Sequence, residues 1–154
     1  QPAAEVPPAT AEPTPLQEKV LIAEDNPGNA RLAEILVRRL GFEPDKAANG
    51  TIALEMANTQ AYALILLDLS MPGLNGFEVA QHLKANCALN ARTPLIALTA
   101  HVDAKMRDRA FAEGIDGFIS KPFLFNDLFR EFRRLLPRHD WESVKTMTPS
   151  ATAS

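Results

Sequence analysis

Apolar residues fall into two alternating patterns between positions 20 and 136 of the chain. The first pattern is a short unbroken apolar run. Its clearest case is Ala63–Leu67, which is too short for a helix and is followed by Pro72 and Gly73. Such a run is typical of a strand buried on both faces of a parallel sheet, so it predicts the central strand. Further runs of this kind lie at 20–23, 93–98 and 117–119.

The second pattern repeats apolar residues at helical spacing. Its first stretch follows Asn26 and Pro27, which suit a helix cap and a first helical turn, and ends at Gly41; its apolar positions are 32, 35, 36 and 40. Further helices are expected at 50–59, from 75 onward, at 103–113 and at 125–136. The polar segment Glu43–Ala47 contains Pro44 and is therefore expected as an edge strand. Five strands alternating with five helices predict a three-layer α/β fold.

The two ends of the chain differ in composition from this alternating region. Residues 1–18 hold five prolines and almost nothing that could be buried, which is typical of a Pro-rich linker. Residues 137–154 carry Trp141 but little else that is apolar, and we expect a flexible C-terminal tail. The sequence therefore predicts one folded domain at 19–136.

Composition narrows the classes of protein that fit. The chain has 154 residues, of which 46% are hydrophobic and 23% charged, enough to bury one core. The net charge of −3, with no basic stretch interleaved with aromatics, argues against nucleic-acid binding. The lone Cys87 cannot form an internal disulfide. No apolar run could span a bilayer and no secretory leader is present, so we expect a cytoplasmic location without membrane contact by this segment.

Polar side chains stand where the predicted strands end. Glu24 and Asp25 follow the first strand, Asp68 follows the central strand, Thr99 follows the fourth and Lys121 follows the last. Because a parallel sheet gathers the carboxyl ends of its strands at one edge, where open α/β folds bind ligands, we expect these five side chains to converge.

Three acids beside one lysine predict a metal and a phosphate. Two like charges about 4 Å apart repel by roughly 4 kcal/mol at an effective dielectric near 20, so the acids require raised pKa values or a divalent cation. Mg²⁺ binds a few carboxylate oxygens and completes its shell with water and phosphate. With Mg²⁺ and Lys121 neutralising phosphate oxygens and Thr99 donating a hydrogen bond, the Asp68 carboxylate could attack phosphorus and form an aspartyl phosphate.

Over residues 19–136 the chain resembles the receiver domain of two-component response regulators, and most closely those of hybrid histidine kinases. The motifs that carry the resemblance are Glu24-Asp25-Asn26-Pro27 with Asn29, Asp68 with Met71-Pro72-Gly73, Leu98-Thr99-Ala100 and Lys121-Pro122-Phe123. The resemblance implies a flavodoxin-like receiver fold, a doubly wound five-stranded parallel sheet of order 2-1-3-4-5 flanked by five helices. It also implies a cis peptide bond before Pro122.

The resemblance further implies a role for each site residue. Asp68 would be the phosphoacceptor, and Thr99 and Lys121 would contact the phosphoryl group as the other catalytic residues. The ligands of Mg²⁺ would be Glu24, Asp25, Asp68 and the backbone carbonyl of Ser70. As an isolated domain the protein would be no enzyme beyond catalysing its own phosphorylation and dephosphorylation, although the parent chain could be a hybrid histidine kinase.

A switch and a partner also follow from the resemblance. Phosphorylation would draw Thr99 inward and let Phe118 rotate, which would relay the signal. The phosphoryl donor would be a histidine kinase or a histidine phosphotransfer protein, docking on the first helix and on the loop after Lys121, where Pro122 and Phe123 are expected to be exposed. The domain itself is expected to be a monomer.

Three alternative classes of protein compete with this interpretation. A haloacid-dehalogenase-type phosphatase requires a second acid two residues after its nucleophile, where this chain has Ser70. A flavodoxin-like cofactor module would place small hydroxyl residues after strand one, where Glu24 and Asp25 would repel a phosphate. A pseudo-receiver, a protein-interaction module that is never phosphorylated, remains open.

Overall fold

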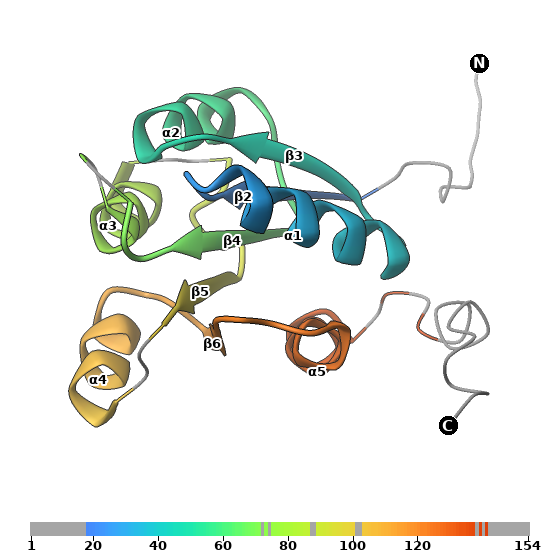
Figure 1. Ribbon diagram of the computed structural model, residues 1–154. Helices are drawn as coiled ribbons and strands as arrows, with labels where there is room; N and C mark the ends of the chain where they lie inside the picture. Colours follow the sequence, from blue (N-terminus) through green and yellow to red (C-terminus); the bar gives the residue numbers. More distant parts are fainter. Residues whose placement is uncertain are drawn as a thin grey trace, which may run out of the picture.

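The computed structural model describes residues 18–141 apart from 72, 74, 87–88, 101–102, 138 and 140. In this part of the chain five strands and five helices alternate (Figure 1). The strands are β2 (Lys19–Ala23), β3 (Glu43–Ala47), β4 (Leu64–Asp68), β5 (Leu95–Thr99) and β6 (Gly117–Ser120). The helices are α1 (Pro27–Arg39), α2 (Gly50–Thr59), α3 (Gly76–Asn86), α4 (Ala104–Ala112) and α5 (Phe125–Leu135).

The five strands form one parallel sheet in the order β3-β2-β4-β5-β6. Counted along the chain this is the order 2-1-3-4-5, so the prediction of a doubly wound α/β fold is confirmed. The central strand β4 is buried throughout, and its Ile65 pairs with Leu21 on one side and Leu95 on the other. The strand β3 lies at the edge, where Pro44 costs no sheet hydrogen bond that a neighbour would need.

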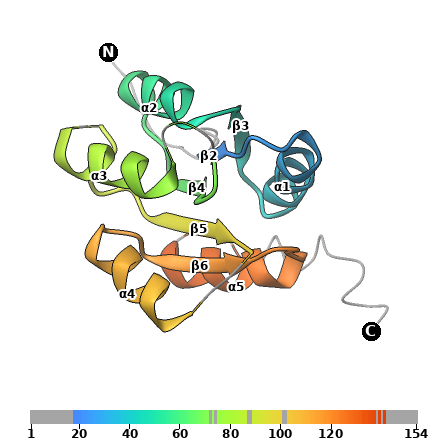
Figure 2. The same ribbon diagram turned by 60° about the vertical axis from the view of Figure 1, so that its left-hand side comes forward.

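Helices cover both faces of the sheet (Figures 1 and 2). Alternate residues of each strand point to opposite faces, so every buried strand contributes to two hydrophobic clusters. One cluster joins the sheet to α2, α3 and α4 through residues such as Ala57, Leu83 and Ala110. The other joins it to α1 and α5 through residues such as Val37 and Phe132. This three-layer packing fixes the edge at which all the strands end.

Side-chain caps begin four of the helices close to the predicted positions. Asn26 Oδ1 accepts a hydrogen bond from the backbone of Asn29 at 2.9 Å and caps α1, and Asn49 and Asp103 cap α2 and α4 in the same way. At α3 the cap is Asn75, whose Oδ1 accepts from the backbone of Glu78 at 3.0 Å. The buried face of α1 consists of small and branched residues, namely Ala30, Ala33, Leu36 and Val37. Two apolar residues that the helical spacing had singled out, Leu32 and Ile35, are instead 38% and 44% exposed.

The packed body continues past residue 136, the predicted end of the domain. Trp141 is 7% exposed, and its ring lies edge-on to Phe129 with centroids 5.6 Å apart. His139 stacks on Phe42 at 4.1 Å and reaches the Glu18 carboxylate at 3.2 Å. These contacts connect the segment after α5 to the start of β2. The remainder of the predicted tail, from 142 onward, lies outside the described residues.

A buried asparagine closes the amino ends of β4 and β5. Asn90 is fully buried, and its amide nitrogen donates to the backbone oxygens of Ala57 at 2.6 Å and Gln60 at 2.9 Å. Its oxygen accepts from the Tyr62 backbone at 2.8 Å and from the Thr93 hydroxyl at 2.9 Å. One side chain therefore links α2 to the segments that precede both strands.

Among the described helices, none combines the length and the apolar character needed to cross a membrane.

Candidate functional site

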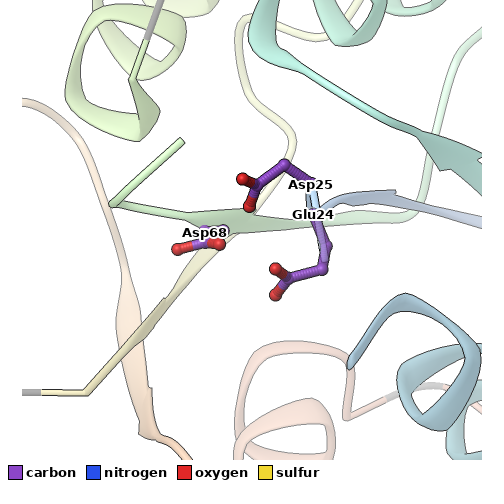
Figure 3. Close-up of side chains that lie close together, drawn as sticks. All are labelled: Glu24, Asp25 and Asp68. Carbon is purple, nitrogen blue, oxygen red and sulfur yellow. The ribbon is translucent and has the colours of Figure 1, made fainter. Parts of the chain in front are cut away.

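Three carboxylates meet at the carboxyl ends of the strands (Figure 3). Glu24 and Asp25 directly follow β2, and Asp68 is the last residue of β4, the neighbouring strand. Each offers a carboxylate oxygen, and these oxygens all lie within 4.8 Å of one another. Glu24 and Asp68 are 3% and 2% exposed, whereas Asp25 is exposed. The predicted convergence of the three acids is therefore observed.

Lys121 brings a cation into this cluster from the end of β6. Its Nζ lies 3.0 Å from Asp68 Oδ2 and 3.2 Å from Glu24 Oε1. The peptide bond between Lys121 and Pro122 is cis, as the resemblance implied. One ammonium thus bridges two buried carboxylates, and it cannot neutralise all three acids.

The electrostatic conflict appears in the proton affinities of the site. Burial, followed by a hydrogen bond to Asp68, raises the pKa of Glu24 to about 7. Burial also acts to raise the pKa of Asp68, but hydrogen bonds from Glu24, the Ser70 amide and Lys121 outweigh it and lower that pKa. Desolvation acts to lower the pKa of Lys121, and its two carboxylate partners raise it overall. Near neutral pH the metal-free site can therefore hold a proton between Glu24 and Asp68.

Three residues after β4, namely Leu69, Ser70 and Gly76, lie close to Asp68 or to the neighbouring strand. The backbone of Ser70 donates to Asp68 Oδ1 at 2.9 Å, and the backbone of Leu69 donates to Leu98 on β5 at 3.1 Å. The first residue of α3 is Gly76, and a Cβ placed there would lie 2.7 Å from the Asp68 carbonyl oxygen. Only glycine lets α3 begin this close to the acid.

Thr99 and Phe118 share the sheet face that packs against α4. Thr99 ends β5 and is 3% exposed, and its hydroxyl donates to the Met106 sulfur of α4 at 3.6 Å. Phe118 on β6 is half-buried and lies edge-on to Phe111 with ring centroids 5.6 Å apart. Because Phe118 pairs with Ala97, two residues before Thr99, both side chains point to the same face.

One expected surface residue proves to be buried. Phe123 is 2% exposed and belongs to the cluster that packs α1 and α5 on the sheet, so the prediction that it is exposed is wrong. The next residue, Leu124, is 69% exposed and has a backbone that donates to Asp127 at 2.8 Å. Because the backbone of Leu124 is extended, neighbouring side chains point in opposite directions, so Leu124 faces solvent and Phe123 does not. Pro122 is exposed, as expected.

The donor set fits a hard divalent cation. All three acids offer oxygen atoms, which Mg²⁺ prefers, and within the described part of the chain no cysteine or histidine joins this cluster. Glu24 Oε1 is buried and has no hydrogen-bond partner among the described residues, although Lys121 lies 3.2 Å away. A buried carboxylate oxygen in this state is stabilised by a bound cation.

Comparisons with known proteins agree with this geometry. The receiver domain of the sensor histidine kinase PA1611 from Pseudomonas aeruginosa is 31% identical, has a TM-score of 0.72 over 79% of this chain and 99% of that one, and has a magnesium ion coordinated in its active site cleft. The chemotaxis protein CheY4 of Vibrio cholerae is 26% identical, with a TM-score of 0.75 over 79% of this chain and 100% of that one.

Comparisons of sequence assign the chain to a family more firmly than the structural neighbours do. The transcriptional regulatory protein SrrA of Staphylococcus aureus is 34% identical over 136 residues, which cover 88% of this chain and 55% of that protein. The chain therefore spans about half the length of the curated relatives it matches. The family model described as the response regulator receiver domain matches residues 20–133. Because this match runs from β2 to α5 and includes every strand that supplies an acid, threonine or lysine to the site, the chain belongs to the response regulator receiver domain family of two-component signal transduction.

Proposed function

We propose that Asp68 is the phosphoacceptor of this receiver domain and takes its phosphoryl group from a phosphohistidine in a Mg²⁺-dependent reaction. The observation that carries the proposal is the position of Asp68 at the end of the central strand, close to the other two acids and to Lys121. Its lowered pKa keeps its carboxylate ionised near neutral pH, as a nucleophile requires.

The transfer can be written in terms of this chain's own residues. A carboxylate oxygen of Asp68 attacks phosphorus while the phosphorus–nitrogen bond of the phosphohistidine breaks. The ring nitrogen keeps the bonding electron pair and takes up a proton, and Asp68 becomes an acyl phosphate. Lys121, already 3.0 Å from Asp68, stabilises the charge that develops on the phosphoryl oxygens.

The residues proposed to hold Mg²⁺ are Glu24, Asp25, Asp68 and the backbone carbonyl of Ser70. When bound, the metal neutralises phosphoryl oxygens and helps to orient the donor. Glu24 must release its proton to serve as a ligand, since its pKa lies at about 7 in the metal-free site. Metal binding should therefore strengthen as the pH rises through neutrality.

The proposed response to phosphorylation begins at Thr99. A phosphoryl group adds close to two negative charges beside this residue, and its hydroxyl is the donor placed to turn toward them. Phe118 on the same face of the sheet would then rotate into the space that the Thr99 loop leaves. The result is a population shift, because the contact to the phosphoryl group exists in one state alone.

We propose a helical, histidine-bearing donor that docks beside the acid cluster, either a histidine kinase or a histidine phosphotransfer protein. Helix α1 starts two residues after Asp25 and exposes Leu32 and Ile35, while Leu124 lies three residues after Lys121. Exposed leucine and isoleucine side chains on two segments that start at the reactive edge suit the apolar face of a partner helix.

The proposed limits of the domain follow from packing. We extend it from 19–136 to include His139 and Trp141, since both contact its hydrophobic residues. Residues 1–18 would serve as a Pro-rich linker and the residues after 141 as a tail. A parent hybrid histidine kinase fits the Glu24-Asp25-Asn26-Pro27 motif, and its full-length sequence would test that assignment.

Phosphorylation by acetyl phosphate with Mg²⁺ tests the proposed nucleophile. We expect one hydroxylamine-sensitive phosphate on the wild-type domain and none on Asp68→Asn. The matched control is Asp45→Asn on β3, which removes a carboxylate whose Oδ2 lies 3.6 Å from Lys19 Nζ. This variant should be labelled normally. A label that persists in Asp68→Asn would overturn the assignment, and an unlabelled wild type would favour the pseudo-receiver.

The docking surface has a test of its own. Ile35→Ser should slow transfer from a phosphohistidine protein about tenfold or more while leaving acetyl phosphate labelling unchanged. Ile52→Ser on α2 is the control, because Ile52 is 37% exposed but lies on the opposite face of the sheet. Equal slowing by both substitutions would exclude α1 as the docking helix.

A further inference from the structure

The Thr99 hydroxyl is engaged with helix α4. Its Oγ1 lies 3.6 Å from the sulfur of Met106, within the range of a hydrogen bond to sulfur. Thr99 is 3% exposed, so this contact is shielded from water. The proposed response requires the same hydroxyl to turn to a phosphoryl oxygen. The sulfur and the phosphoryl group therefore compete for one donor.

Met106 is held firmly in place at the start of α4. Its backbone N–H donates to the Asp103 side chain at 2.8 Å, which is the N-cap bond of the helix. Its half-buried side chain packs against the hydrophobic cluster formed by the sheet and helices α2 to α4. The position of the sulfur therefore changes together with the position of the first turn of α4.

The same helix also contacts the second switch residue. The Arg107 guanidinium lies 5.8 Å from the centroid of the Phe118 ring, and Phe111 packs edge-on to that ring. Two consecutive residues of one helical turn, Met106 and Arg107, therefore contact Thr99 and Phe118 separately. A displacement of this turn would change both contacts together.

We propose that Met106 is a positioning residue that holds the Thr99 hydroxyl toward α4 in the unphosphorylated domain and opposes its movement to the phosphoryl group. This inference rests on the proposed phosphorylation of Asp68. When the hydroxyl turns to the phosphoryl oxygen, its contact to Met106 breaks, and the first turn of α4 loses this hydrogen bond to the end of β5.

The direction of the exchange follows from the two acceptors. A thioether sulfur is a weak hydrogen-bond acceptor, whereas a phosphoryl oxygen is charged and accepts much more strongly. The phosphoryl group wins the hydroxyl, but the contact to Met106 reduces the net gain. By linkage, removing the sulfur should favour the phosphorylated conformation and tighten binding of a phosphoryl mimic.

The experiment measures the affinity of the domain for beryllofluoride in the presence of Mg²⁺, followed by NMR. Met106→Leu keeps the apolar volume and removes the acceptor, so we expect binding about two- to fivefold tighter. Met106→Gln restores an acceptor of similar length, which should return the affinity to the wild-type value or weaken it. A merely structural role for Met106 would not produce these opposite effects.

Met56→Leu is the matched control. Met56 lies on α2, is also half-buried and packs against the same hydrophobic cluster. This substitution should leave the affinity for beryllofluoride unchanged. If both methionine-to-leucine variants tighten binding equally, the effect arises from general packing and the inference is wrong.

A double-mutant cycle isolates the pair itself. Thr99→Val removes the hydroxyl and keeps the branched shape, so Met106→Leu should have no further effect on affinity in that background. An unchanged effect of Met106→Leu in Thr99→Val would overturn the inference. Failure of the wild type to bind beryllofluoride, or binding that survives Asp68→Asn, would instead refute the proposed function.

Discussion

The two ends of the sheet bury polar groups in opposite ways. At the amino ends of the strands, the neutral side chain of Asn90 is fully buried, and both its nitrogen and its oxygen form hydrogen bonds. At the carboxyl ends, Glu24 and Asp68 are almost as deeply buried, but they are like charges that share Lys121 and a proton. At the amino ends the buried polar group has all its hydrogen bonds within the fold, whereas at the carboxyl ends the like charges of the buried acids are only partly compensated.

This difference distinguishes buried polar groups that stabilise the fold from buried charged groups that form a binding site. A buried neutral group with complete hydrogen bonds stabilises one arrangement of the chain. Buried acids with incomplete compensation destabilise the domain until a cation binds to them. We therefore expect substitutions at the two ends of the sheet to change stability in opposite directions. Changes at the amino ends of the strands should destabilise the domain, whereas removal of a charge at their carboxyl ends should stabilise it.

The largest expected effect lies at the amino end. Asn90→Ala removes four hydrogen bonds at once, those to Ala57, Gln60, Tyr62 and Thr93, and each contributes about 0.5–1.5 kcal/mol to stability. We expect a loss of about 4 kcal/mol in the free energy of unfolding, measured with urea. Asn49→Ala is the control, because it removes only the exposed cap of α2 and should cost about 1 kcal/mol. Equal losses would mean that the Asn90 network is not what closes this end.

The second prediction tests where in the sequence the packed domain ends, using a residue that packs near the amino ends of the strands. Trp141 packs against Phe129 and Phe42 and donates to the Leu136 carbonyl at 2.8 Å. Trp141→Ala should therefore reduce the free energy of unfolding by about 3 kcal/mol, a typical cost of truncating a buried aromatic residue. Trp141→Phe keeps most of the apolar surface and should recover more than half of that loss. No loss in the alanine variant would return the domain boundary to residue 136.

Sequence patterns predicted the sheet and the convergence of its three acids well, for a physical reason. A strand buried on both faces must be apolar throughout, so its end is marked by the first polar residue, as at Asp68. Parallel pairing then brings those ends together without further information. The order of the strands and the ligand roles came from the family resemblance instead, since apolar runs alone do not state which strands are neighbours.

The sequence was less informative wherever exposure depended on tertiary packing. Leu32 and Ile35 are exposed although small residues such as Ala33 are buried, because close helix packing on the sheet favours small side chains. Phe123 and Trp141 are buried by contacts with segments far away in the sequence, which no local pattern encodes. The role of Asn90 depends likewise on backbone groups about 30 residues away.

The third prediction concerns the carboxyl end and pH. The pKa of Glu24 is about 7 in the folded domain, against 4.5 for an ordinary glutamate, so the folded state holds a proton that the unfolded chain has lost. Stability should therefore fall as the pH rises from 4.5 to 7 in the metal-free protein, by about 1–3 kcal/mol in total. The lowered pKa of Asp68 acts in a separate window, since its contribution is lost only as the pH falls below its ordinary value of 3.8.

Unfolding at several pH values with a chelator present checks this prediction. Glu24→Gln keeps a hydrogen-bond donor for Asp68 but cannot titrate, so it should remove the decline between pH 4.5 and 7. Comparison with the wild type cancels the contributions of groups elsewhere in the domain. An identical pH profile in both proteins would contradict the raised pKa.

The smallest expected effect is also at the carboxyl end, and its sign should depend on the metal. Asp25 is exposed, so its repulsion by the two buried acids is screened, and Asp25→Asn should stabilise the metal-free domain by less than about 1 kcal/mol. In excess Mg²⁺ the wild type should become the more stable protein, because a ligand that binds the folded state alone stabilises it by mass action. Asp108→Asn, which removes an exposed charge on α4, should show no such reversal. If Asp25→Asn remained the more stable protein at every Mg²⁺ concentration, Asp25 would not be a ligand of the metal.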